Sequence, residues 1–75
     1  MTTPKKLSLT ALRLKRTRTQ LAVAARTGWK ESAVSRLERG EGSCRVDTLQ
    51  RYVKALGGQL RLVAVFRDDE FEIDV

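Results

Sequence analysis

The chain has 75 residues, of which 41% are hydrophobic, and a formal net charge of +6. This length allows one domain with a small core, and no apolar run approaches the roughly 20 residues that a membrane span needs. The lack of histidine and the single cysteine exclude a histidine-based metal site or catalytic triad and an internal disulfide. We therefore expect a cytoplasmic binding protein that is not an enzyme and needs no metal or cofactor.

The first half of the chain predicts a basic arm and three short helices. Residues 1–7 are expected to form the flexible arm. Ser8 is a suitable N-cap for a first helix that runs to about Arg16. A second helix is expected over residues 20–27 and a third over residues 31–39, with a glycine in the turn between them.

The third helix has two faces of different chemistry. Val34 and Leu37 are apolar and three residues apart, so with Ala33 they are expected to form a buried face. A polar face carries, at positions i, i+4 and i+7, Ser32, Arg36 and Arg39. Such a helix can pack on its own domain and still lie in a DNA major groove. Together with the preceding helix and turn, it predicts a helix-turn-helix.

A fourth helix is expected after a loop at residues 40–46. Asp47 is the expected N-cap of this helix, and the pair Gly57-Gly58 is expected to end it. The expected buried stripe, at positions i, i+3, i+4 and i+7, is Leu49, Tyr52, Val53 and Leu56.

A β-hairpin is expected over residues 59–75. Residues 59–66 and 71–75 alternate with the period of two that a strand requires, and residues 67–70 form a polar turn. An isolated hairpin is only marginally stable in water, so we expect it to pair with the hairpin of a second subunit. The alternative is that it folds back on its own helices. The expected interface residues are Leu60, Leu62, Val63, Val65, Phe66, Phe71 and Ile73.

Charge is distributed unevenly between the two halves. Residues 1–40 contain ten basic and two acidic residues, whereas residues 41–75 contain five basic and seven acidic residues. A solvated surface is the usual reason for a charged run. The complete lack of acids in residues 1–30, beside a helix-turn-helix, favours a polyanionic partner, namely double-stranded DNA.

The stretch from residue 19 to residue 40 resembles the helix-turn-helix of the Xre family, the Cro and phage-repressor type. The residues that carry the likeness are Thr19-Gln20, Val23-Ala24, Gly28 and the run Val34-Ser35-Arg36-Leu37-Glu38-Arg39-Gly40. The likeness continues to Gly58 and covers residues 8–58. It implies a lambda-repressor-like domain of four to five helices that binds a palindromic operator as a dimer.

The resemblance also implies roles for individual residues. The residues expected to read bases are Lys30, Glu31, Ser32 and Arg36. Arg36 suits a bidentate contact with guanine, whereas Glu31 serves equally well as a first-turn acid. The residues expected to contact phosphate are Gln20, Arg16, Arg18, Arg39 and Lys15, of which Lys15, Arg16 and Arg18 can also be ordinary solvated charges. Arg13 and Glu38 match a structural ion pair of the family.

Three departures from the family pattern affect local geometry. Thr17 and Arg18 replace the glycine-aliphatic pair that usually joins the first two helices. Lys30 occupies the usual Ser/Thr N-cap of the recognition helix, which loses a cap worth about 1 kcal/mol. A contact between the Lys30 ammonium and DNA would explain that loss. Trp29 stands where the family has an aliphatic residue, and we expect it to pack against the core.

The C-terminal segment narrows the resemblance to small HigA-type antitoxins. The residues that carry it are the run 49–60, the apolar run 63–66 and the acidic strand that follows. It implies autorepression of a shared operon and neutralisation of a RelE-type ribonuclease toxin. The acidic tail would suit a basic toxin, but it serves equally as protection of a strand edge against aggregation. The alternatives are a stand-alone prophage or restriction-controller repressor, and a protein-binding module without DNA activity.

Overall fold

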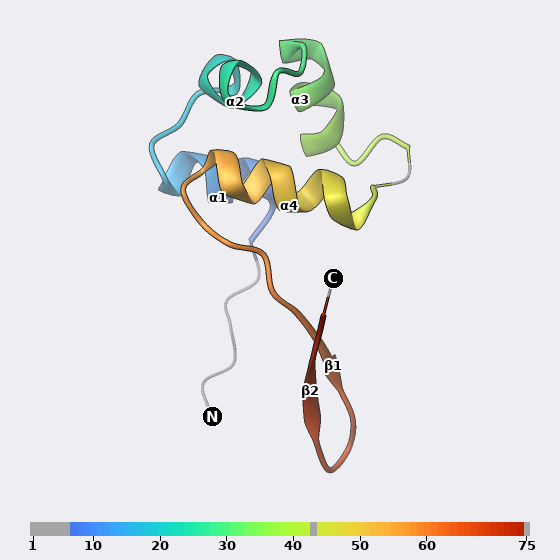
Figure 1. The fold of residues 1–75 in the computed structure, drawn as a ribbon. Coiled ribbons are helices and arrows are strands. Elements are labelled where there is room, and N and C mark those ends of the chain that lie inside the picture. The colour runs from blue at the N-terminus through green and yellow to red at the C-terminus, as the bar shows by residue number, and fades with distance from the viewer. Residues whose placement is uncertain (1–6, 43, 75) are drawn as a thin grey trace.

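Four helices precede one antiparallel β-hairpin (Figure 1). The computed structural model describes residues 7–42 and 44–74. Its elements are α1 (Leu9–Lys15), α2 (Gln20–Thr27), α3 (Glu31–Glu38), α4 (Val46–Ala55), β1 (Leu62–Val65) and β2 (Glu70–Ile73). The predicted mainly helical class with a C-terminal hairpin is confirmed, with four helices in the described part of the chain. The predicted basic arm lies, apart from residue 7, outside the described residues.

The helix ends follow from local sequence. The side-chain oxygens of Ser8 and Thr19 accept hydrogen bonds from the first backbone turns of α1 and α2, at 3.1 and 3.0 Å. Gly28 ends α2 with a φ of 80°, which glycine adopts without steric cost. Thr17 has a φ of 55° in the α1–α2 connection, where the family pattern has glycine. This position is therefore strained.

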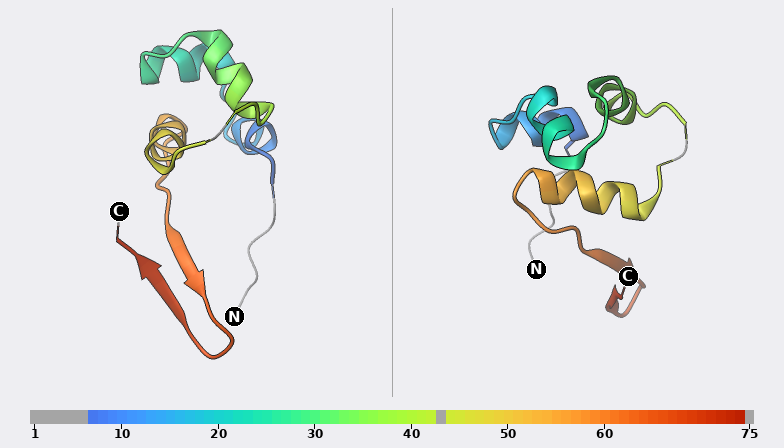
Figure 2. Two further views of the ribbon diagram at one scale, coloured as in Figure 1. Left: turned by 90° about the vertical axis from the view of Figure 1, so that its right-hand side faces the viewer. Right: turned by 45° about the horizontal axis from the view of Figure 1, so that its top comes forward.

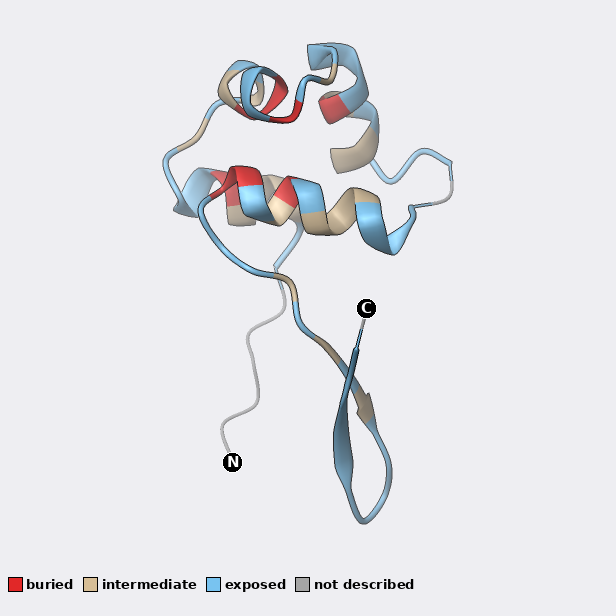
Figure 3. Ribbon diagram, in the orientation of Figure 1, coloured by how far each residue is buried: buried red, intermediate tan, exposed pale blue. Residues whose placement is uncertain are grey.

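The core lies between the helix pair α2–α3 and the helix pair α1–α4 (Figure 3). Its buried hydrophobic residues are Val23, Ala24, Val34, Tyr52, Ala55 and Leu56. Leu9, Leu12, Trp29, Leu37 and Val53 pack around them and are partly buried. Of the predicted stripe of the fourth helix, Tyr52, Val53 and Leu56 thus face the core, with Tyr52 the most buried, whereas Leu49 is half-buried. In the described residues no helix is long and apolar enough to cross a membrane.

Two sequence-based expectations about the helices are wrong. Asp47 is not the N-cap, because α4 begins at Val46 and its N-cap is Arg45, two residues before Asp47. The Asp47 carboxylate accepts a hydrogen bond from the Thr48 amide at 2.9 Å. Ala33 is exposed and does not share the buried face with Val34. One residue along a helix is a rotation of about 100°, which carries Ala33 out of the core.

The hairpin extends away from the helices, at the end of the molecule opposite α2 and α3 (Figures 1 and 2). It does not fold back over its own helices, and β2 is exposed along its whole length. The strands are shorter than predicted, because the Phe66 amide donates to the Asp69 carbonyl at 2.7 Å and closes the turn there. As a result, β1 stops at Val65 and β2 starts at Glu70, one residue before the predicted Phe71.

The strand register separates the hairpin into one apolar and one mixed face. Leu62 pairs with Ile73 and Ala64 with Phe71, whereas Val63 pairs with Glu72 and Val65 with Glu70. Residues paired across a hairpin point to the same side. The first two pairs therefore form an apolar face, which Phe66 joins through an edge-to-face contact with Phe71 at 6.1 Å. Val63 and Val65, which are among the expected interface residues, lie on the mixed face, each opposite a glutamate.

Candidate nucleic-acid interface

The Glu38 carboxylate links three other helices to α3. It accepts hydrogen bonds from Arg13 Nε and Nη2 at 2.8 and 3.1 Å, and from Thr10 Oγ1 at 2.9 Å. Gln20 Nε2 lies 3.2 Å and the Tyr52 hydroxyl 2.8 Å from its oxygens. The Glu38 side chain is only 2% exposed. The ion pair between Arg13 and Glu38 that the family resemblance implies is therefore present, as part of a larger network.

The network keeps Glu38 ionised. Burial alone raises the pKa of this carboxyl, but the hydrogen bonds from Arg13, Tyr52, Gln20 and Thr10 outweigh it and lower the pKa to about 2. The hydrogen bond to Glu38 raises the pKa of Arg13, against the effect of its own burial. Burial and the contact with Glu38 raise the pKa of Tyr52. At neutral pH the centre of the domain thus holds a stable pair of opposite charges.

Gln20 stands at the start of α2 but is partly buried. Its side-chain amide nitrogen is directed to Glu38, at 3.2 Å. This contact fixes the carboxamide at the N-terminal end of α2, where backbone amides and the helix dipole favour an anion. Gln20 therefore connects the buried network to the position at which the family resemblance implies a phosphate contact.

The expected base-reading residues are all exposed at α3. Lys30 has an extended backbone at the N-cap position, and its side chain forms no capping hydrogen bond to the described residues. Glu31 lies in the first turn of α3, and Ser32 and Arg36 follow on the helix surface. Because Val34 is fully buried, the opposite side of α3 holds the helix on the domain. This leaves a polar helix face free to enter a groove.

The end of α3 carries a group of linked charges. Arg39 donates from Nη1 to Ser35 Oγ, and its Nε and Nη2 each lie 3.2 Å from an oxygen of Glu41. Arg36 Nε lies 3.9 Å from the same carboxylate. Sequence reasoning did not assign any role to Glu41. The signal that could have placed it is Gly40, whose position just after a helix predicts a turn that brings the next residue back over the helix end.

The other expected phosphate contacts lie away from α3. Lys15 and Arg16 are exposed at the end of α1, and Arg16 Nε lies 3.4 Å from the Leu56 carbonyl at the end of α4. Arg18 Nε is buried and has no hydrogen-bond partner in the described part of the chain. The structure therefore does not bring these three cations together with the face of α3.

Two arginines that the sequence analysis left out lie beside the helix-turn-helix. Arg45 precedes α4 and forms an ion pair with Asp47 at 3.3 Å. The Arg51 guanidinium carbon lies 5.1 Å from the centre of the Trp29 ring, and its Nη2 donates to the Thr27 carbonyl at 2.6 Å. Trp29 thus packs partly into the core, as expected, and holds α4 against the turn.

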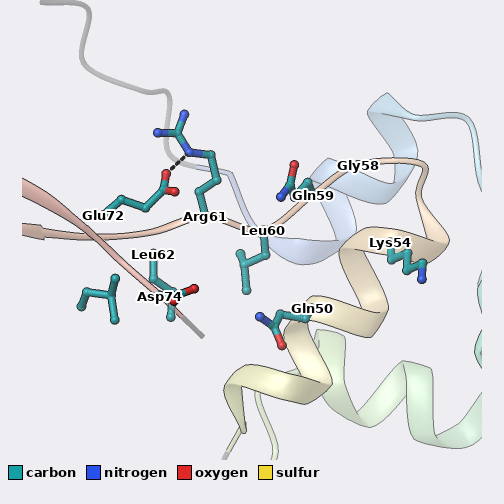
Figure 4. Close-up of a pocket in the computed structure, with 10 residues that line it drawn as sticks. Gln50, Lys54, Gly58, Gln59, Leu60, Arg61, Leu62, Glu72 and Asp74 are labelled. Carbon is teal, nitrogen blue, oxygen red and sulfur yellow. Dashed lines mark hydrogen bonds and ion pairs between the residues drawn. The ribbon is translucent and has the colours of Figure 1, made fainter.

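An open groove of about 490 Å³ separates α4 from the hairpin (Figure 4). Gln50 and Lys54 of α4 form one wall. Leu60 and Leu62 line the other wall at the base of β1, together with Ile73 from β2. Arg61 and Glu72 form an ion pair on the strands beside it. The apolar face of the hairpin therefore continues into a groove that the chain itself leaves open.

Comparison with known proteins identifies the class of this fold. The family model for helix-turn-helix domains of the Xre type matches residues 9–63. The chain belongs to this helix-turn-helix family, which confirms the resemblance inferred from its motifs.

Two sequence relatives agree with the resemblance to small HigA-type antitoxins. The chain is 41% identical over 66 residues to the candidate antitoxin HigA2 of Mycobacterium tuberculosis, covering 87% of this chain and 65% of that protein. It is 47% identical over 55 residues to the candidate antitoxin HigA3 of the same organism, covering 72% of this chain and 50% of that protein. The chain thus spans less than two thirds of the length of these relatives.

Two solved structures match nearly the whole fold. One is a HigA antitoxin described as bending DNA through a unique dimerization, with a TM-score of 0.83, 38% identity and coverage of 93% of this chain and 92% of that one. The other is DNA-bound antitoxin HigA3, with a TM-score of 0.86, 36% identity and coverage of 96% and 95%. The likeness includes the hairpin, because the helices alone would not give such coverage.

Proposed function

We propose that this chain is a dimeric DNA-binding antitoxin that represses its own operon. The observation that carries the proposal is the similarity, over more than nine tenths of the chain, to two solved HigA antitoxins, one of them bound to DNA. The exposed polar face of α3 and the strongly basic N-terminal half support it. The proposed activity is binding and not catalysis, and its site of action is the cytoplasm, on the nucleoid.

In the proposed complex α3 lies in the major groove. Arg36 is exposed on α3 and has the planar fork that takes guanine O6 and N7 together. Lys30, Glu31 and Ser32 reach base edges from the start of the same helix. The proposed phosphate contacts are Gln20 at the start of α2, Arg39 at the end of α3 and the outlying cations Lys15, Arg16 and Arg18.

The test of DNA reading compares two duplexes of equal length and composition. One is the DNA directly upstream of the reading frame, and the other is its scrambled sequence. We expect Arg36→Ala to lower the ratio of the two affinities by roughly 5- to 150-fold, the effect of losing about 1–3 kcal/mol of base discrimination. The control Arg67→Ala removes an exposed charge in the hairpin turn and should leave the ratio unchanged. An unchanged ratio for Arg36→Ala would mean that Arg36 does not read bases.

We propose that the hairpin, within residues 59–75, forms the dimer contact through its apolar face. Phe71 and Ile73 are 55% and 48% exposed in the single chain, which is unfavourable for side chains of this size in water. A second copy covers both hairpins and allows two recognition helices to meet two halves of a palindrome. Val65, on the mixed face, provides the matched control.

Sedimentation equilibrium tests this interface. We expect Phe71→Ser to weaken the dimer by at least tenfold and Val65→Ser to weaken it by less than about threefold, because only Phe71 lies on the apolar face. Equal effects of the two substitutions would contradict the proposed face. A monomeric wild-type chain would contradict the dimer itself.

Co-expression with the adjacent reading frame tests the antitoxin activity. Toxicity of the neighbouring protein that this chain relieves would establish neutralisation of a toxin, for which a RelE-type ribonuclease is the proposed class. A harmless neighbour together with specific DNA binding would instead indicate a stand-alone repressor. Partner binding that does not change with salt, without DNA binding, would indicate a protein-binding module, because phosphate contacts weaken steeply between about 50 and 200 mM salt.

A further inference from the structure

The backbone at the end of α3 holds Glu41 in a defined place. Gly40 has a φ of 73°, and its amide donates to the Leu37 carbonyl at 3.1 Å. The Glu41 amide donates to the Arg36 carbonyl, also at 3.1 Å. These two bonds form the Schellman arrangement that turns the chain back over the last helical turn. The position of Glu41 thus depends on backbone contacts and not on its own side chain.

From this position the Glu41 carboxylate binds arginines of α3. Both of its oxygens lie 3.2 Å from Arg39, one from Nε and one from Nη2, and Arg36 Nε lies 3.9 Å away. A paired contact of this kind is the geometry in which arginine binds either a carboxylate or a phosphate. Hydrogen bonds from Arg39 also hold the pKa of Glu41 below its ordinary value, so the carboxylate is charged at neutral pH.

We propose that Glu41 occupies, in the free protein, the place at which a DNA phosphate binds Arg39, and that it thereby suppresses sequence-independent binding. This inference rests on the proposed DNA-binding function and adds to it a residue that limits the attraction to phosphate. A phosphate that approaches the end of α3 meets arginines already neutralised by Glu41, and it must displace or repel that carboxylate.

Glu41 removes a different fraction of the binding free energy from a sequence-independent complex than from an operator complex. Sequence-independent binding consists almost entirely of phosphate attraction, whereas an operator complex also gains contacts with base edges. A fixed negative charge beside the phosphate contact lowers both affinities by a similar factor, and it therefore removes a larger share of the binding free energy from scrambled DNA than from the operator. Glu41 acts on the DNA through Arg39 and does not itself touch a base.

The experiment measures the affinity of Glu41→Gln for a short scrambled duplex and for the upstream duplex, by fluorescence anisotropy, from about 50 to 200 mM salt. Glutamine keeps the size of the side chain and removes its charge. We expect about fivefold tighter binding to the scrambled duplex, the scale of one unit charge near a phosphate in water. The slope of log affinity against log salt should become steeper by about 0.9, corresponding to one further phosphate neutralised.

Asp68→Asn is the matched control. Asp68 is exposed in the hairpin turn, at the opposite end of the molecule from α3, and the substitution changes the net charge by the same amount. We expect it to change neither the slope nor the affinity by more than about twofold, since charges beyond a Debye length of about 10 Å are largely screened.

Each outcome tests either the role of Glu41 or the proposed DNA-binding function. An unchanged slope for Glu41→Gln, or weaker binding to the scrambled duplex, overturns the role of Glu41 and leaves DNA binding intact. The second of these results would mean that Glu41 orients Arg39 for its contact. Failure of the wild-type protein to bind either duplex overturns the proposed function itself. Thermal unfolding of both variants, monitored by circular dichroism, verifies that the fold is kept.

Discussion

Replacing Glu38 with glutamine removes the charge at the centre of the buried network. The guanidinium of Arg13, whose side chain is 10% exposed, then remains in the domain without its counter-ion. Breaking a buried pair in this way costs about 3–5 kcal/mol. A chain of 75 residues has a total stability of roughly 4–11 kcal/mol. We therefore expect Glu38→Gln to lose a large part of the free energy of unfolding at neutral pH.

The pKa of Glu38 gives an independent estimate of the same energy. Folding lowers it from 4.5 to about 2, and each unit corresponds to 1.36 kcal/mol, so ionisation of this group contributes about 3 kcal/mol. Because the folded-state pKa is the lower one, this contribution is complete above about pH 4.5. It is lost as the pH falls from there towards 2. At pH 3 about 2 kcal/mol of it should be gone.

Urea unfolding at fixed protein concentration measures both effects through Trp29, the chain's single tryptophan. We expect Glu38→Gln to lose at least about 3 kcal/mol at pH 7 and to approach the wild type at pH 3. The control Glu72→Gln removes an exposed ion pair with Arg61 and should cost less than about 1 kcal/mol. A loss below about 1 kcal/mol for Glu38→Gln at pH 7, or a loss that does not shrink at pH 3, would refute this reasoning.

Three further substitutions test local features. Lys30→Ser should raise the free energy of unfolding by about 1 kcal/mol by capping α3, measured by thermal unfolding. It should also weaken DNA binding, measured by anisotropy. Unchanged DNA affinity would mean that Lys30 is not in the interface. Thr17→Gly should raise the free energy of unfolding by up to about 1 kcal/mol, measured with urea, because it relieves a positive φ of 55°. Destabilisation would show that the strain at this position is negligible. Arg51→Met should lower the free energy of unfolding by about 1 kcal/mol and alter the fluorescence emission of Trp29, because it removes the cation that lies over the indole ring. An unaltered emission spectrum would contradict that stacking in solution.

The helices were predictable because their signals are local. Ser8 caps α1 and Gly28 ends α2 within one residue of the predicted positions, since both depend on contacts inside a single turn. The errors at Asp47 and Ala33 are also local: the N-cap of α4 lies two residues earlier than predicted, and the buried position next to Ala33 is Val34. Which of two neighbouring residues starts a helix or is buried depends on which of them the rest of the fold covers. Local propensity alone does not distinguish them.

The candidate interface was predictable only in part. The family motif singled out α3 and its exposed residues, because a motif records the positions that share a helix face. It gave no role to Glu41, a single acidic residue in a loop, whose importance depends on the Schellman turn that returns it to Arg39. It also did not indicate that Arg16, an expected phosphate contact, lies with its Nε 3.4 Å from the Leu56 carbonyl at the end of α4.

The sequence by itself determined which segments are helices, that a hairpin follows them and which helix presents a basic polar face. These properties follow from periodicities and caps that act over a few residues. The resemblance implied that Arg13 pairs with Glu38, but only the tertiary structure decided the other partners, because Thr10 and Tyr52 are 28 and 14 residues from Glu38 along the chain. It also decided that the hairpin stands clear of the helices with one apolar face open, since cross-strand register and packing depend on where distant segments meet.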